Sequence, residues 1–164
     1  MQADRVDAHK RGLRNGQEGA LVMKLYGRMI APGRASGETL VASQGISFFG
    51  GVDAETGVIV ERGHELEGQC IAGKVLVFPG GKGSTVGSYT LYRLKHAGKA
   101  PAAIINAECE TIIAVGCIIA EIPCVDQVSL AEIRSGVWLE VDGDCGEVEW
   151  IGYNREKNNE SDGM

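Results

Sequence analysis

Residues 74–106 contain the pattern that most restricts the fold: an apolar run, a glycine-rich loop, a helix-like segment and a second apolar run. The first run, KVLVFPG (74–80), is continuously apolar and rich in valine, as expected of a strand buried on both faces. Apolar residues recur at helical spacing over 88–98, and Gly98 stands where a helix C-terminus favours glycine. Because PAAIIN (101–106) returns as a second buried strand, the unit predicts a right-handed parallel crossover.

The flanking segments predict further strands around this crossover. Strands are expected at 24–30 and 36–43, separated by the turn APGRASG, and another strand is expected at the end of the glycine-rich segment 47–60. A second helix is expected within 110–123, ending before a proline and followed by the short strand CVD. Alternation around DGD predicts a β-hairpin over 137–151. The fold class is therefore mixed α/β, a β/β/α domain with β-hairpins around a small parallel crossover.

Composition limits the domain organisation and the classes of partner. The chain has 164 residues, 44% of them hydrophobic, which is enough for one domain with a core. Residues 1–21 are expected to be a flexible leader, 22–152 the folded domain and 153–164 a disordered tail, with Met23 a candidate start of the functional protein. A net charge of −6 without a basic block disfavours nucleic-acid binding. No apolar run approaches the roughly 18 residues of a membrane span, and no signal peptide is recognisable, so we expect a cytoplasmic protein.

The cysteines and histidines do not form a recognisable metal motif. The five cysteines are Cys70, Cys109, Cys117, Cys124 and Cys145. Their spacing includes no CxxC pair, and two interpretations remain: an iron–sulfur or metal site at the three central cysteines, or buried free thiols in a reducing compartment. The Ile/Ala/Val surroundings favour free thiols. His64 and His96 are expected at the surface, and no histidine lies in the glycine loop.

The glycine loop within FPGGKGSTVGSYTLY (78–92) could bind a phosphate, carry a reactive hydroxyl or simply form a turn. It does not match the Walker loop, because Lys82 is followed by Gly83 rather than by serine or threonine. It does not match the dinucleotide fingerprint either, because Val86 occupies the place of the third glycine. Neither standard nucleotide-binding motif is therefore present.

The loop composition nevertheless suits an anionic group. Gly81 and Gly83 would let backbone N–H groups approach a ligand at the start of the following helix, and Lys82 adds positive charge. In such surroundings Ser84 could act as a base or nucleophile, with its charged form stabilised by the amides. The alternative is that Ser84 or Thr85 merely caps the helix.

A second candidate segment, SFFGGVDAETG (47–57), places two phenylalanines beside a glycine pair. In a chain with only 5% aromatic residues, these side chains are either core anchors or part of an interface. The candidates for a partner interface or site rim are Ser47, Phe48, Phe49, Gly50, Gly51 and Asp53. Asn106, Glu108 and Glu110 follow the second crossover strand, where they could contact a ligand or belong to a solvated loop.

Four segments in this order and spacing resemble the small subunit of the aconitase X family. They are SFFGGVD, KVLVFPGGKGSTVGSYTLY, APAAIINAE and ETIIAVGCIIAEIP, of which GGKGSTVGSY is the most specific. The resemblance covers about 22–152 and implies a swivelling β/β/α domain. It also implies a large partner subunit with an iron–sulfur cluster held by its own cysteines, so that no metal is bound by this chain. Ser84 matches the family's serine proton acceptor, and Gly81, Lys82, Gly83 and Thr85 would support it or the substrate.

The resemblance implies a hydro-lyase that is active only as a heterodimer. Its archaeal branch dehydrates a phosphorylated hydroxy acid, (R)-mevalonate 5-phosphate, to trans-anhydromevalonate 5-phosphate in isoprenoid biosynthesis. The bacterial branch dehydrates cis-3-hydroxy-L-proline, and Ser84 cannot discriminate between the two substrates because both carry a hydroxyl β to a carboxylate. A non-catalytic anion-binding domain is the alternative from a different class.

Overall fold

The computed structural model describes residues 23–151, so the predicted leader and tail lie outside the described residues. The strands are β1 Lys24–Tyr26, β2 Arg28–Ala31, β3 Arg34–Val41, β4 Val75–Phe78, β5 Ala103–Asn106, β6 Cys124–Asp126, β7 Trp138–Asp142 and β8 Glu147–Trp150. The helices are α1 Phe48–Gly51, α2 Gly87–His96, α3 Thr111–Ala120 and the 3₁₀ turn η1 Leu130–Glu132. Within 23–151, no helix is both long enough and apolar enough to cross a membrane.

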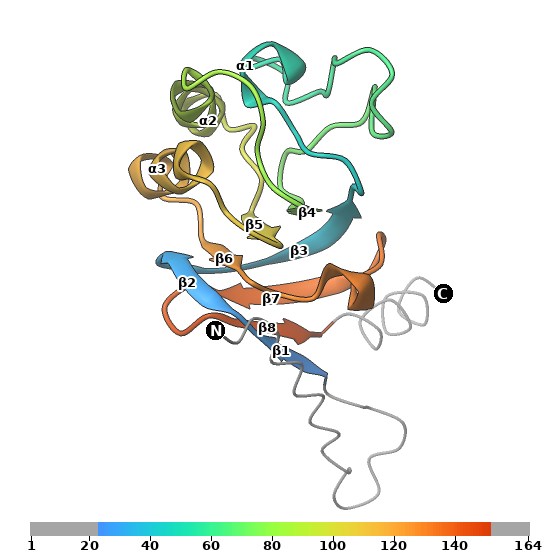
Figure 1. Cartoon of the computed structure of the whole chain (residues 1–164), viewed down its shortest axis with the longest axis vertical. Coiled ribbons are helices and arrows are strands. Elements are labelled where there is room, and N and C mark those ends of the chain that lie inside the picture. The colour runs from blue at the N-terminus through green and yellow to red at the C-terminus, as the bar shows by residue number, and fades with distance from the viewer. Residues whose placement is uncertain (1–22, 152–164) are drawn as a thin grey trace, which may run out of the picture.

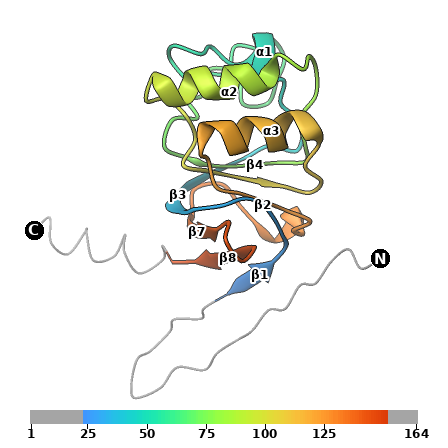
Figure 2. The ribbon, with the colours of Figure 1, turned by 90° about the vertical axis from the view of Figure 1, so that its left-hand side faces the viewer.

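The strands form one mixed sheet in the order β1-β8-β7-β3-β4-β5-β6-β2. Strands β3, β4, β5 and β6 run parallel, and the remaining pairings are antiparallel. β1 and β2 follow each other in the chain yet occupy opposite ends of this order, so the sheet curls back on itself. The result is three layers: β1, β7 and β8, then the parallel strands, then the helices (Figure 1). α2 and α3 lie side by side in the outer layer (Figure 2).

Alternation along the central strand β4 explains the two hydrophobic cores. Val75 and Val77 face the core between the two strand layers, whereas Leu76 and Phe78 face the core beneath the helices. All four side chains are completely buried, as a continuously apolar strand requires. The predicted parallel crossover and the β/β/α class are therefore confirmed, with β4 and β5 paired from Val75↔Ala103 to Phe78↔Asn106.

The C-terminal end of α2 and the β7–β8 hairpin agree with the predictions from the sequence. Gly98 has φ +71° just beyond α2, which is the left-handed conformation that glycine adopts readily. Glu110 caps α3 by accepting a hydrogen bond from the Ile113 N–H at 3.2 Å. The hairpin β7–β8 closes around Gly143–Gly146, as the DGD turn predicts.

Three local predictions were wrong. The single strand expected at 24–30 is divided into β1, which pairs with β8, and β2, which pairs with β6. The strand expected at the end of 47–60 is absent: this stretch contains α1, a turn and only isolated bridges, Val52↔Ile59 and Val58↔Cys70. The segment APGRASG is not a turn throughout, because β3 already begins at Arg34 and pairs with β7. At APGRASG, pairing with the distant strand β7 decides the conformation, and local composition does not indicate that pairing. In 47–60 the bridges join single residue pairs that are close in sequence, so no strand forms.

Candidate functional site

The two candidate loops meet at the carboxyl ends of neighbouring parallel strands. The segment after β3 and the loop after β4 form a parallel bridge between Ile46 and Gly81. The Ile46 N–H donates to the Gly80 carbonyl at 3.3 Å, and the Lys82 N–H donates to the Ile46 carbonyl at 3.1 Å. Because parallel strands end at one edge of a sheet, this is where such folds place ligand contacts.

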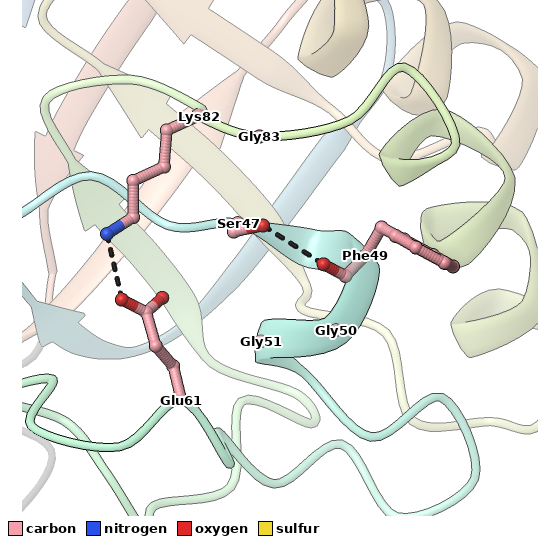
Figure 3. Close-up of a pocket in the computed structure, with 7 residues that line it drawn as sticks. All are labelled: Ser47, Phe49, Gly50, Gly51, Glu61, Lys82 and Gly83. Carbon is pink, nitrogen blue, oxygen red and sulfur yellow. Dashed lines mark hydrogen bonds and ion pairs between the residues drawn. The ribbon is translucent and has the colours of Figure 1, made fainter.

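A cavity of about 280 Å³ lies between these loops (Figure 3). Its lining residues are Ser47, Phe49, Gly50, Gly51, Glu61, Lys82 and Gly83. All of them except Glu61 are candidates from the sequence, so the structure brings most of the two predicted clusters together. Phe48, Asp53, Gly81, Ser84 and Thr85 do not line the cavity.

Ser47 and Gly83 approach each other closely at this cavity. The Ser47 hydroxyl donates to the Phe49 carbonyl at 3.0 Å. Gly83 has φ +94°, and a Cβ atom at this position would stand 2.5 Å from the Ser47 Oγ. Gly83 is therefore required both by its backbone conformation and by the close approach of the neighbouring loop.

Ser84 is exposed beside the first turn of α2. Its Oγ accepts a hydrogen bond from the Val86 N–H at 3.1 Å, and its carbonyl accepts from the Gly87 N–H at 3.0 Å. The N–H groups of Gly83, Ser84 and Thr85 have no acceptor within residues 23–151. The hydroxyl therefore stabilises the turn, while three neighbouring backbone donors remain open to solvent or to an anionic group.

Lys82 does not contact Ser84. Its ammonium group donates to the Glu61 carboxylate at 2.8 Å, at the end of the cavity opposite Phe49 (Figure 3). The pair is partly exposed, with 47% of the Lys82 side chain and 29% of the Glu61 side chain accessible. The positive charge expected beside the serine is thus balanced by a carboxylate that sequence reasoning did not identify.

We expect this ion pair to position Lys82 without stabilising the fold appreciably. In a double-mutant cycle of Glu61→Ala and Lys82→Ala, the coupling free energy should be about 0.2–1 kcal/mol, because solvent screens a partly exposed pair. Urea unfolding of the wild type, both single variants and the double variant measures this coupling. A coupling above about 2 kcal/mol would contradict the expectation, since it is the magnitude of a desolvated pair.

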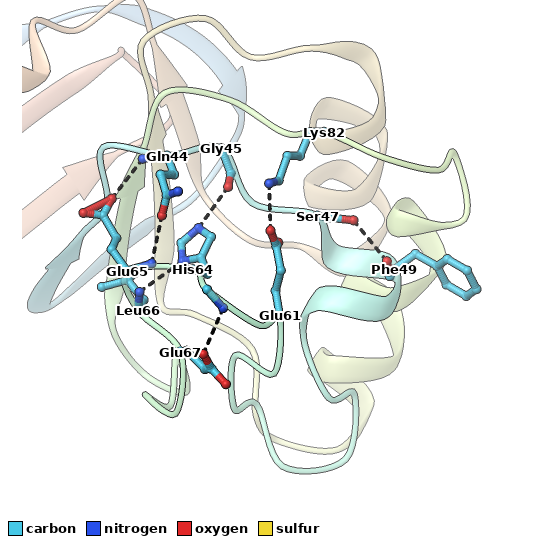
Figure 4. Close-up of polar contacts among 11 residues, drawn as sticks. Gln44, Gly45, Ser47, Phe49, Glu61, His64, Glu65, Leu66, Glu67 and Lys82 are labelled. Atoms are coloured by element: carbon cyan, nitrogen blue, oxygen red, sulfur yellow. Dashed lines mark hydrogen bonds and ion pairs between the residues drawn. The ribbon is translucent and has the colours of Figure 1, made fainter.

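The loop that carries Glu61 is held by a polar network around His64 (Figure 4). His64 is only 5% exposed, so its expected surface position was wrong. Its Nε2 lies 3.0 Å from the Gly45 carbonyl, and its Nδ1 accepts from the Leu66 N–H at 3.1 Å. These two bonds define the tautomer with the proton on Nε2. They tie the loop to the segment that leads into Ser47.

Glu65 fastens the same loop to the end of β3. Its carboxylate accepts hydrogen bonds from the Ser43 hydroxyl at 2.8 Å, the Ser43 N–H and the Gln44 N–H at 2.9 Å. The Ser43 hydroxyl, followed by the two backbone donors, holds the pKa of Glu65 below its ordinary value despite the opposing effect of burial. Glu65 therefore remains an acceptor at neutral pH.

The other candidates have structural roles. Phe48 is 1% exposed and packs against Phe78 with ring centroids 6.0 Å apart, so it is a core anchor and only Phe49 of the pair reaches the surface. Asp53 accepts from the Glu55 N–H and stabilises a turn. Gly81 permits close packing, because a Cβ atom there would lie 2.6 Å from the Glu110 carboxylate.

The structure also shows the surroundings of the three polar residues at and after the end of β5 that the sequence left open. Asn106 is fully buried, and its Nδ2 donates to the Phe78 carbonyl at 3.0 Å, while its Oδ1 has no partner within residues 23–151. Glu110 is the α3 cap. Glu108 is exposed, and its carbonyl would lie 2.9 Å from a Cβ atom at Gly80. Asn106 and Glu110 therefore organise the backbone around the glycine loop.

The cysteine thiols do not form a recognisable metal site in the described part of the chain. Hydrogen bonding to Cys124, followed by burial, raises the pKa of Cys109 far above its ordinary value, so its thiol stays protonated. Metal binding requires the thiolate. Over residues 23–151, no group of three or more His, Cys, Asp or Glu side chains is arranged to hold a metal ion. All five cysteines are free thiols, but only Cys117 and Cys124 are buried, so the expectation of buried thiols was wrong for the exposed Cys70 and Cys145.

Sequence reasoning missed the roles of Glu61, which lines the cavity, and of His64 and Glu65, which bind the Glu61 loop to the segment after β3. Each acts across about 20 residues of sequence, with Glu61 paired to Lys82, His64 to Gly45 and Glu65 to Ser43. The run of polar residues ERGHELE was the only available signal, and such runs are more often solvated.

Known proteins share this fold over most of the described chain. The Aconitase X swivel domain family matches residues 24–150. The phosphomevalonate dehydratase small subunit of Thermococcus kodakarensis is 54% identical over 127 residues, covering 77% of this chain and 96% of the relative. The subunit of the same name from Methanosarcina acetivorans is 52% identical over 132 residues, covering 79% of this chain and 92% of the relative.

A solved structure agrees with these matches. The crystal structure of aconitase X from Thermococcus kodakaraensis in its holo-form superposes with a TM-score of 0.77 at 53% identity, covering 78% of this chain and 98% of that one. The matched region contains the parallel crossover, the glycine loop and the cavity between the two loops. The chain belongs to the aconitase X swivel domain family.

Proposed function

We propose that this chain is the small subunit of a phosphomevalonate dehydratase, a hydro-lyase that converts (R)-mevalonate 5-phosphate to trans-anhydromevalonate 5-phosphate together with a large subunit. The observation that carries the reaction type is the exposed Ser84 hydroxyl among open backbone N–H groups at the start of α2. The substrate rests on the names of relatives at 52–54% identity. Because such an enzyme and its substrate are metabolic, we place the complex in the cytoplasm.

Ser84 is the proposed proton acceptor. Dehydration next to a carboxylate breaks a C–H bond and a C–O bond, forming a double bond and releasing the hydroxyl group. A serine hydroxyl in water is far too weak an acid to supply a base. Backbone donors can lower the cost of its charged form, and the Val86 N–H already points at the Oγ from 3.1 Å. The alkoxide would take the proton from carbon and become the neutral hydroxyl, and transfer of that proton to the released hydroxide would give water and regenerate the alkoxide.

The residues around Ser84 have distinct supporting roles. The open N–H groups of Gly83 and Thr85 lie on either side of the serine, where they can stabilise negative charge on the serine or on the substrate. The Lys82 ammonium group lies at the end of the cavity opposite Phe49, where it is paired with the Glu61 carboxylate. We infer that this end receives a polar part of the substrate, with the Lys82 ammonium available to an anion.

The proposal places an iron–sulfur cluster in the large subunit. Within residues 23–151 the cysteines, which include the exposed Cys70 and Cys145, are not grouped with other possible ligands into a site for a cluster, so its ligands would come from the partner. When bound, such a cluster supplies a Lewis acid for the departing hydroxyl. The contribution of this chain is then limited to the base and to the walls of the cavity.

Reconstitution tests the proposal directly. The full chain, coexpressed with the large subunit and loaded with iron and sulfide anaerobically, should dehydrate (R)-mevalonate 5-phosphate, and each subunit alone should be inactive. Liquid chromatography with mass detection of the product, 18 Da lighter than the substrate, measures the reaction. Turnover of cis-3-hydroxy-L-proline instead would reject the substrate but keep the reaction class. An assembled, iron-loaded complex that acts on neither compound would reject the enzymatic role.

A further inference from the structure

The outer surface of the helical layer is apolar. Between 40% and 58% of each of its large hydrophobic side chains is exposed. They come from α1, from the first two turns of α2 together with its N-cap, and from α3, and we call them the helical face: Phe49, Val86, Tyr89, Tyr92, Val115, Ile118 and Ile119. An exposed apolar surface built from so many neighbouring side chains marks an interaction site more often than a free surface.

The packing of α2 on α3 makes this face continuous. The Ser88 hydroxyl donates to the Ile112 carbonyl at 2.6 Å, and a Cβ atom at Gly116 would lie 2.5 Å from the Leu91 side chain. The two helices therefore approach closely, and Figure 2 shows them side by side. The Tyr89 and Tyr92 rings stack with centroids 6.1 Å apart.

The composition of α3 also indicates that the helical face is an interaction site. Its ten residues, TIIAVGCIIA, include no charged side chain. Ile113 and Cys117 face the sheet and are buried, whereas Ile118 and Ile119 lie on the opposite side and are exposed. A helix that is apolar all round is normally covered on all sides. The sheet covers only one side of α3.

We propose that the helical face is the docking surface for the large subunit, an inference that rests on the proposed function. The matched relatives are named small subunits, and the region shared with this chain spans 92–96% of their length. Almost nothing in those subunits is left over to cover the corresponding helices. In those relatives, a partner chain is therefore needed to cover the helices that correspond to α2 and α3.

The position of Ser84 supports the same partner. Val86, two residues after Ser84, belongs to the face, and Phe49 belongs to both the face and the cavity. α1 and α2 also contact each other, since a Cβ atom at Gly87 would lie 3.7 Å from the Phe49 N. A large subunit seated on the helical face would thus extend over the exposed serine and exclude water from it.

Charged substitutions on the face test this inference. In the full chain, Ile118→Glu and Tyr89→Glu should each weaken binding of the large subunit more than about tenfold, because each buries an unpaired charge. Met29→Glu is the matched control: Met29 is 56% exposed but lies on β2, outside the face, so its affinity should stay within about threefold of the wild type. Isothermal titration calorimetry measures the dissociation constants, and thermal unfolding verifies that each variant is folded.

Because the experiment measures affinity for the large subunit and not turnover, it tests the docking surface separately from the proposed function. Ser84→Ala should bind the large subunit as the wild type does, whether or not it turns over substrate. Wild-type affinity for both face variants would overturn the docking surface while leaving the proposed function intact. A change in the self-association of the isolated chain, without any change in large-subunit affinity, would assign the face to a second copy and also overturn it. A wild-type chain that does not bind the large subunit would reject both.

Discussion

Replacing Ser84 by alanine in the assembled complex should lower kcat for mevalonate 5-phosphate dehydration about 10³-fold and leave assembly unchanged. Positioned acid–base groups contribute about 10²–10⁴-fold, and here the base has no substitute nearby, because Lys82 is paired with Glu61. Among residues 23–151 the Ser84 Oγ makes one hydrogen bond, from the Val86 N–H, so the loss of stability should be modest. Steady-state kinetics of the iron-loaded complex measures the change.

Two variants distinguish a base from a cap. Ser84→Asn keeps a side-chain oxygen that can accept from the Val86 N–H but removes the hydroxyl, so it should restore stability and remain inactive. Ser88→Ala removes a hydroxyl one helical turn away, whose bond to the Ile112 carbonyl is structural, and should reduce stability but not kcat. Activity of Ser84→Asn within about tenfold of the wild type would show that the serine acts only as a cap.

The fold could be predicted where local pattern and burial agree. The apolar strand β4, the glycine Gly98 after α2 and the DGD hairpin each require one conformation for a local reason. The pairing of β2 with β6 and the curling of the sheet depend on contacts about 100 residues apart, for example Arg28 with Asp126. Such contacts leave no periodic signal in a single sequence.

The candidate residues were chosen for their chemistry, and the sheet topology shows which of them lie together. Gly83 and Ser47 were identified separately, and nothing in the sequence indicated that they touch, because the bridge between Ile46 and Gly81 depends on the parallel order of β3 and β4. The charge of Lys82 was recognised, but its partner Glu61 was not. The sequence identifies which side chains are reactive or charged, whereas the strand order of the sheet determines which of them are in contact.

Gly83 gives the second large expected effect. Gly83→Ala should lower kcat about 10²-fold, because a left-handed residue with a side chain costs about 1–2 kcal/mol and the new methyl group would stand 2.5 Å from the Ser47 Oγ. Ser47 would have to rotate and lose its bond to the Phe49 carbonyl, or the loop would have to move. Either movement displaces the neighbouring Ser84, and even a small displacement of a reacting group lowers the reaction rate strongly. Steady-state kinetics at saturating substrate measures kcat.

Gly98→Ala separates backbone strain from the contact at the site. Gly98 has φ +71° and no atom within 4 Å of an added Cβ, and it lies at the other end of α2. The two substitutions therefore impose a similar backbone strain energy. Only the methyl group added at Gly83 contacts a residue that lines the cavity. Gly98→Ala should lose unfolding free energy through backbone strain alone, Gly83→Ala should lose more because it also disturbs Ser47, and Gly98→Ala should retain the kcat of the wild type per folded complex. Equal kcat values for the two variants would mean that the glycine loop does not position Ser84, since the contact with Ser47 would then have no consequence for the reaction.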